Sequence, residues 1–475
     1  MKSRLLMAAF LAALPSVAPA QSMQELKNQP PDGAQLTFLL TDGTVLAQGF
    51  RNSDFWVLTP DDTGSYVNGT WKQVGSLQAG YAPSANASQV LADGRVLMEG
   101  GEYNPGGTFA LTNQGAIYDP TTQAWTAVKP PKGWQNIGDS PSVVLPNGDF
   151  LIGDKLNKKM AELNPKSMKW KEVSSKGKND FNAEEGWELM PDGSIVTWDV
   201  KDNPQSENYI PSKGKWVSLG STIANLQGPP CCGCITYPPK NKCYYPPGEV
   251  GPGVLMPDGT VFATGATHSG QATAHTAVYT PGAGWAAGPD FPNDDQAGDS
   301  FITLLTNGDG MVEGDSGELY IWDGTNLTDT KLQGYGMLTV LPNGQILVGG
   351  TEVYNSSGTY QAAWQPTISN YPSSVTPGDT YQISGTQFNG LSQAGNGMGD
   401  EYQSSTNYPL IQISNNSTGH VFYAREHDPS TMGVATGSTT VSTNFDVPSN
   451  IETGASSLVV IANGIPSSPV SITVQ

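Results

Sequence analysis

Seven times along the chain, a short apolar run is followed by an Asp-Gly or Asn-Gly pair and then by a second apolar run. The copies read FLLTDGTVLAQG, QVLADGRVLMEGG, VVLPNGDFLIGD, ELMPDGSIVTWD, VLMPDGTVFATG, TLLTNGDGMVEGD and TVLPNGQILVGG. Such pairs favour type I′ turns, because both central residues of that turn need a positive φ. The pattern predicts seven tight β-hairpins, with turn residues Asp42, Asp93, Asn147, Asp192, Asp258, Asn307 and Asn343.

After most hairpins, an aromatic residue or leucine is followed by a turn and a tryptophan. The pairs are Tyr118 and Trp125, Leu163 and Trp170, Tyr209 and Trp216, and Tyr279 and Trp285. Two further strands per unit are therefore expected, which gives four-stranded blades. Seven such blades close a β-propeller, in which each blade is buried against its neighbours. The sequence predicts a seven-bladed β-propeller over residues 21–367.

Beyond Trp364 the repeat stops, and the chain becomes rich in Ser, Thr, Asn and Gly. Short segments with apolar residues at every second position continue to the C-terminus, which is typical of strands with one buried face. They are 381–384, 410–413, 420–423, 457–461 and 470–474. We expect an immunoglobulin-like β-sandwich over residues 368–475, and an all-β protein as a whole.

Residues 1–20 combine Lys2 and Arg4, an apolar run and an Ala-Pro-Ala ending, the layout of a cleaved export signal. We therefore predict a secreted or periplasmic protein. The formal net charge of -20 disfavours nucleic acid as a partner, because phosphate backbones are also negative. No other segment is long and apolar enough for a membrane span. A monomer is expected.

The four cysteines lie close together, at Cys231, Cys232, Cys234 and Cys243. An even number of cysteines in an exported chain favours structural disulfides. Three pairings are possible, and the spacing does not choose among them. Four thiolates holding a soft metal are the alternative.

The DGRVLMEGG, DGTVFATG and NGQILVGG segments resemble kelch repeats, and the whole chain resembles the galactose oxidase-like superfamily. The resemblance implies an early-set C-terminal domain and an axial copper ion held by two tyrosines and two histidines, with one tyrosine crosslinked to a cysteine. Tyr335 and His427 match two of those ligands, His427 within YAREHD. Gly336 stands where the family has another histidine, and the crosslinking cysteine has no counterpart. Copper is therefore not expected, and Tyr335 and His427 remain as metal-ligand candidates.

Acidic residues recur eight positions before the hairpin turns, where the innermost strands should begin. Asp139, Glu184 and Asp299 occupy this position in three of the predicted blades. Converging carboxylates could bind calcium, accept hydrogen bonds from sugar hydroxyls, or share a proton as an acid/base pair. They could also only cap backbone amides. With Tyr335 and His427, these three acids form the predicted ligand site at the axial mouth.

The leading hypothesis is an exported galactose oxidase-like kelch protein that binds a polar ligand, above all a carbohydrate, at the mouth of the propeller. Its copper site would be degenerate. A copper-radical oxidase of primary alcohols or aldehydes is one alternative, and a structural or adhesive surface protein is another.

Overall fold

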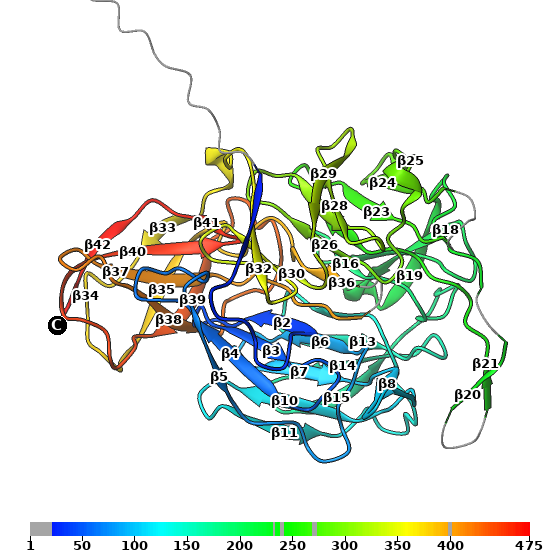
Figure 1. Cartoon of the computed structure of the whole chain (residues 1–475), viewed down its shortest axis with the longest axis horizontal. Coiled ribbons are helices and arrows are strands. Elements are labelled where there is room, and N and C mark those ends of the chain that lie inside the picture. Colours follow the sequence, from blue (N-terminus) through cyan, green and yellow to red (C-terminus); the bar gives the residue numbers. More distant parts are fainter. Residues whose placement is uncertain (1–20, 231–232, 238–241, 268–272, 398–400) are drawn as a thin grey trace, which may run out of the picture.

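The computed structural model describes residues 21–230, 233–237, 242–267, 273–397 and 401–475. Within them, six sheets of four strands and one of five surround one axis as a β-propeller, and a curled sheet lies beside them (Figure 1). The export signal predicted for residues 1–20 lies outside the described residues. Among those residues, no helix is long and apolar enough to cross a membrane.

The first four blades follow the order of the predicted hairpins. Blade 1 holds β2 (Leu36–Leu39), β3 (Val45–Gln48), β4 (Phe55–Thr59) and β5 (Thr70–Gln73). Blade 2 holds β6 (Ala87–Val90), β7 (Val96–Glu99), β10 (Gly115–Asp119) and β11 (Ala124–Val128). Blade 3 holds β12 (Ser142–Val144), β13 (Phe150–Gly153), β14 (Met160–Asn164) and β15 (Lys169–Val173). Blade 4 holds β16 (Glu188–Leu189), β17 (Ile195–Trp198), β18 (Gln205–Ile210) and β19 (Lys215–Ser221).

The last three blades complete the ring. Blade 5 holds β22 (Gly253–Leu255), β23 (Val261–Thr264), β24 (Thr276–Thr280) and β25 (Gly284–Ala287). Blade 6 holds β26 (Phe301–Leu304), β27 (Gly310–Glu313), β28 (Glu318–Trp322) and β29 (Leu327–Gln333). Blade 7 holds β30 (Leu338–Val340), β31 (Ile346–Val348), β32 (Glu352–Asn355) and the N-terminal β1 (Ser22–Glu25). Because β1 pairs with β32, the two ends of the propeller segment close the ring.

Within the described residues, two short hairpins and three 3₁₀ turns lie outside the strands of the blades. The hairpins are β8 (Tyr103–Asn104) with β9 (Thr108–Phe109), and β20 (Ile235–Tyr237) with β21 (Lys242–Tyr244). The 3₁₀ turns are η1 (Pro211–Lys213), η2 (Pro292–Asp294) and η3 (Ala362–Trp364). A disulfide between Cys234 and Cys243 closes the second hairpin. Cys231 and Cys232 lie outside the described residues.

The seven hairpins are confirmed, but the predicted turn type is wrong. At each turn only the glycine has a positive φ, between 75° at Gly43 and 93° at Gly308. The residue before it keeps a negative φ because its side chain binds the backbone two residues on, as Asp42 accepts the Thr44 N–H at 3.1 Å. The turns are therefore type I turns followed by a left-handed glycine, not type I′.

The inner and outer strands of a blade differ in burial. The inner strands, such as β6, are buried along their whole length, whereas an outer strand such as β11 is largely open to solvent. The predicted tyrosine and tryptophan pairs lie across from each other on the third and fourth strands. The ring centroids of Tyr118 and Trp125, for example, lie 5.3 Å apart.

The C-terminal strands form one curled nine-stranded sheet. Its members are β33 (Thr367–Asn370), β34 (Ser374–Val375), β35 (Thr380–Thr386), β37 (Leu410–Asn415), β38 (Val421–His427), β39 (Val441–Asp446), β40 (Gly454–Ala462), β41 (Ile465–Pro466) and β42 (Val470–Val474). Since β38 pairs with both β37 and β39, the strands are continuous. The immunoglobulin-like sandwich stays a prediction.

This sheet packs on the propeller face that carries the hairpin turns. The Glu426 N–H donates to the Thr41 carbonyl at 3.1 Å, and the Met432 N–H donates to the Pro146 carbonyl at 3.0 Å. The opposite end of each inner strand, where the strand begins, therefore lies on the face away from these contacts. We call the channel opening on that face the axial mouth.

One loop of the C-terminal sheet enters the channel, and we call its described residues, 391–397 and 401–407, the axial loop. Its β36 (Asn396–Gly397) pairs with β26, the inner strand of blade 6. Farther along the loop, the Tyr402 hydroxyl accepts hydrogen bonds from the Ala85 N–H at 2.6 Å and from Gln35 Nε2 at 2.7 Å. The loop therefore joins blades 1, 2 and 6 at the axis.

Candidate functional site at the axial mouth

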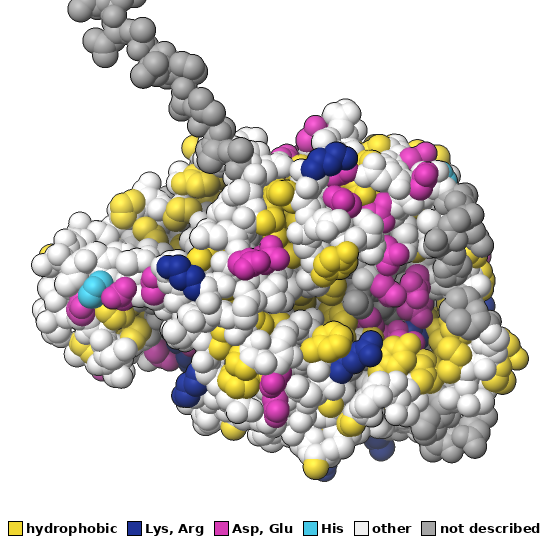
Figure 2. All heavy atoms as spheres, in the orientation of Figure 1, with side chains coloured by type: hydrophobic (Ala, Val, Ile, Leu, Met, Phe, Trp, Pro, Cys, Tyr) yellow, Lys and Arg dark blue, Asp and Glu magenta, His cyan; other side chains and the backbone are white. Residues whose placement is uncertain are grey.

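The three predicted acids lie together at the axial mouth. Asp139, Glu184 and Asp299 each come just before an inner strand, β12, β16 and β26 respectively. Glu184 and Asp299 have left-handed backbone conformations, with φ of 59° and 53°, so the chain turns sharply where it enters the channel. Figure 2 shows acidic side chains gathered in a hollow on this face, over the region of β16 and β36 in Figure 1.

A buried lysine lies between two of these acids. Lys155, just after β13, has no exposed side-chain surface; it forms ion pairs with Asp139 and, at 2.5 Å, with Glu184. Burial alone would lower the pKa of Lys155, but the two carboxylates outweigh it and hold that pKa well above its ordinary value. Lys155 therefore stays charged and neutralises part of the acidic mouth.

An aromatic wall borders this ion cluster. Tyr244, next to the Cys234–Cys243 disulfide, donates its hydroxyl hydrogen to Glu184 Oε1 at 3.1 Å, and Lys155 Nζ lies 5.5 Å from the centre of its ring. Phe109 follows at 6.4 Å from Tyr244, and Tyr103 at 5.9 Å from Phe109. Because Tyr103 is 38% exposed, the wall offers an open apolar face beside charged groups.

Two acids of the mouth have pKa values near neutrality. Burial, together with the charges of Glu184 and Asp299, raises the pKa of Glu102 to about 7 although Lys155 opposes the shift. The side chain of Asp299 is exposed, but the protein groups around its carboxyl group remove part of its hydration. This desolvation and the negative charge of Glu184 raise the pKa of Asp299 to about 6. Carboxyl groups of this kind exchange protons near neutral pH, which suits ligand binding and acid–base chemistry alike.

The structure does not bring Tyr335 and His427 together. Tyr335 precedes β30 on the mouth face, where it is 63% exposed and its hydroxyl donates to the Ser316 carbonyl at 2.7 Å. His427 ends β38 in the C-terminal sheet, where its ring contacts Asp428 at 2.9 Å and Asp446 at 3.3 Å. His427 therefore lies on a strand of the C-terminal sheet, and the segment of this sheet that enters the channel is the axial loop.

The residues of the mouth do not fit the copper site that the resemblance implies. The donors there are carboxylates, phenols and one ammonium group, whereas copper(II) prefers imidazole nitrogen. Among the described histidines, His275 contacts Asp290, His420 contacts Glu452, and His427 lies in the C-terminal sheet. His268 lies outside the described residues. We therefore assign no copper chemistry to this site.

Sequence reasoning missed Lys155, Glu102 and the aromatic wall. The sequence did contain a signal for Lys155 and Glu102, because the second strand of a blade ends on the same face of the propeller on which the inner strand begins. Counting forward from the turns, Lys155 stands eight positions after Asn147, and Glu102 nine after Asp93. No comparable signal placed Tyr244 at the mouth, since its position depends on the β20–β21 hairpin.

A large groove lies elsewhere on the described protein. It has a volume of about 760 Å³ and runs between blade 7 and the C-terminal sheet, with Asn343, Tyr360 and Gln412 among its lining residues. No charged side chain lines it. The mouth is the better candidate because titratable and aromatic groups converge there.

No protein-family model and no curated protein sequence matches the chain. Among solved structures, the chain is similar to a fungal alcohol oxidase of the AA5 family in complex with copper, with a TM-score of 0.51 and 12% identity. That match covers 96% of this chain and 98% of the oxidase. At this identity, the likeness supports the fold and not the activity.

Two weaker likenesses were found. A catalytically inactive variant of virginiamycin B lyase from Staphylococcus aureus with quinupristin has a TM-score of 0.48 and 11% identity, covering 70% of this chain and 98% of the lyase. The extracellular domain of a one-component system from B. thetaiotaomicron has a TM-score of 0.46 and 12% identity, covering 97% of this chain and 58% of that one. We base no argument on either.

Proposed function

We propose that the protein binds a carbohydrate at the axial mouth. The observation that carries the proposal is the juxtaposition of Asp299 and Glu102 with the aromatic wall around the buried Lys155. Carboxylates accept strong hydrogen bonds from hydroxyl groups, and an aromatic ring packs against the apolar C–H face of a sugar. A site with both features suits a polyhydroxylated ligand.

The charge of the mouth narrows the class of sugar. Four carboxyl groups, of Glu102, Asp139, Glu184 and Asp299, surround one ammonium group. An acidic sugar would be repelled by the carboxylates that Lys155 does not neutralise. Neutral sugars and amino sugars are therefore the proposed ligands.

We also place the chain, as part of this proposal, with the galactose oxidase-like kelch proteins, and its C-terminal sheet with their immunoglobulin-like early-set domain. The kelch-like hairpins and the fold match support this placement. Export is part of the same proposal, and the Cys234–Cys243 disulfide supports it because disulfides persist in oxidising compartments. A calcium ion in the axial channel and a monomeric state remain predictions.

The pH dependence of binding tests the proposal. On a glycan array, we expect binding to neutral or amino sugars at pH 8 and an affinity about tenfold lower at pH 5. The reason is that, as the pH falls, Glu102 loses its charge near its pKa of about 7 and Asp299 near its pKa of about 6. Binding to uronic acids only, at any pH, would contradict the proposed ligand class. Binding to no glycan would favour the structural or adhesive alternative.

A further inference from the structure

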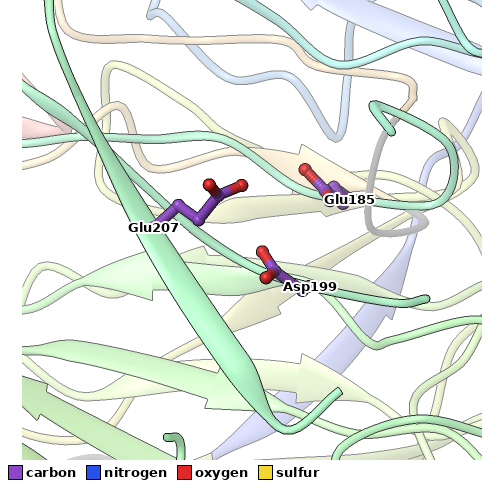
Figure 3. Close-up of side chains that lie close together, drawn as sticks. All are labelled: Glu185, Asp199 and Glu207. Carbon is purple, nitrogen blue, oxygen red and sulfur yellow. The ribbon is translucent and has the colours of Figure 1, made fainter. Parts of the chain in front are cut away.

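A second group of acids lies inside blade 4, away from the open part of the mouth. Glu185 comes just before β16, Asp199 just after β17, and Glu207 lies in β18. Figure 3 shows their carboxyl groups converging from three segments of the blade. One oxygen from each lies within 4.8 Å of the other two, and the three residues are 0%, 1% and 2% exposed. Water does not screen these charges.

The lysine within this group neutralises only one of the three carboxylates. Lys178 Nζ forms ion pairs with Glu185 at 2.6 Å and with Glu207 at 2.8 Å, and it lies 4.7 Å from the centre of the Trp216 ring. When all three acids are ionised, the group carries two excess negative charges. Burying such an excess is costly, so a further positive charge is needed.

Asp199 provides an independent observation that points to a bound ligand. Among the described residues, neither of its carboxyl oxygens has a hydrogen-bond partner, and Glu185 Oε1 has none either. Buried polar groups in folded proteins are nearly always hydrogen-bonded or bound to an ion. The free oxygens of Asp199 point toward the other two acids (Figure 3).

We propose that Glu185, Asp199 and Glu207 bind a divalent cation of the calcium class. Three carboxylates form a hard, all-oxygen donor set, which suits calcium rather than a soft metal. Ca–O bonds of about 2.4 Å let two ligand oxygens lie at most about 4.8 Å apart, and the three oxygens here all lie within that distance of one another. Such an ion balances the charge that Lys178 leaves.

The cation would also hold in place a segment of the chain that lines the mouth. Glu185 follows Glu184 directly, so an ion bound to Glu185 holds the segment that presents Glu184 to Lys155. The cation site does not depend on the proposed sugar binding, because none of its three ligands belongs to the mouth acids.

Terbium luminescence with calcium competition tests the site, because Trp216 lies close enough to sensitise a bound ion. We expect one calcium-displaceable terbium ion per chain, and a melting temperature at least about 5 °C higher in calcium chloride than in EDTA. Asp199→Asn should abolish both effects. Asp299→Asn at the mouth, and Glu99→Gln at another fully buried glutamate, should keep both.

Elemental analysis of the wild type gives an answer even where Asp199→Asn fails to fold. One equivalent of calcium per chain that Asp299→Asn also retains supports the site, because a calcium ion in the axial channel would depend on Asp299. No bound calcium, together with equal melting temperatures in calcium and EDTA, would overturn it and would mean that a proton neutralises Asp199. Neither result depends on whether a glycan binds.

Discussion

Replacing Lys155 with methionine should lower the free energy of unfolding by about 3–5 kcal/mol. The Lys155 side chain has no exposed surface, and its two partners are nearly or largely buried, with side-chain exposures of 3% for Asp139 and 12% for Glu184. Without the ammonium group, both carboxylates remain in the mouth with no cation between them. Urea denaturation followed by tryptophan fluorescence measures the loss.

A matched control comes from the same blade. Lys171 pairs with Glu162 at 3.7 Å but is 78% exposed, so Lys171→Met should change the stability by less than about 1 kcal/mol. Adding Asp139→Asn to Lys155→Met should recover part of the loss, because it removes one of the two negative charges that Lys155 neutralised. Equal stability of Lys155→Met and Lys171→Met would contradict the ion cluster.

Removing the hydroxyl of Tyr402 should lower the free energy of unfolding by about 1–3 kcal/mol and loosen the axial loop. In Tyr402→Phe, the buried Ala85 N–H loses its acceptor at 2.6 Å, and an unsatisfied buried donor costs its full desolvation. Gln35 loses the same acceptor, although its side chain keeps a bond to Ser84 at 2.8 Å. Thermal denaturation and limited proteolysis measure the two effects.

Tyr371→Phe serves as the control for this change, because Tyr371 is 37% exposed between β33 and β34. The free energy of unfolding of Tyr371→Phe should be almost the same as that of the wild type. Suppose that Tyr402→Phe unfolds at the same temperature as Tyr371→Phe and that a protease cleaves it no faster. The axial loop would then not anchor the C-terminal sheet to the propeller.

The local features of the fold could be predicted from the sequence. Asp-Gly and Asn-Gly pairs between apolar runs define hairpins without reference to distant residues, and the tyrosine–tryptophan spacing defines the two outer strands. The turn type was not predictable from the dipeptide alone, because the Asp42 side chain binds the Thr44 N–H and keeps its own φ negative. Type I and type I′ turns accept the same residues, and the hydrogen bond from the Thr44 N–H to the Asp42 side chain selects the type I turn.

The parts that depend on assembly could not be predicted. The axial loop reads as a polar linker in the sequence, yet it is buried because polar groups of the inner strands bind it, as the Thr303 hydroxyl donates to the Ala394 carbonyl at 2.9 Å. Asp139, Glu184 and Asp299 were found by counting inner-strand positions. Glu102 and Lys155 follow second strands, so this count did not find them. The charge of Lys155 neutralises part of a site that the three acids alone would make strongly negative.

A calorimetric titration with a glycan selected on the array tests the central claim most directly. Asp299→Asn removes a solvent-open charge of the mouth, whereas Asp258→Asn changes a turn aspartate on the opposite face and keeps the acceptor for the Thr260 N–H. We predict an affinity about tenfold weaker for Asp299→Asn and an unchanged affinity for Asp258→Asn, with both proteins folded. Equal affinities for the two variants and the wild type would contradict binding at the axial mouth.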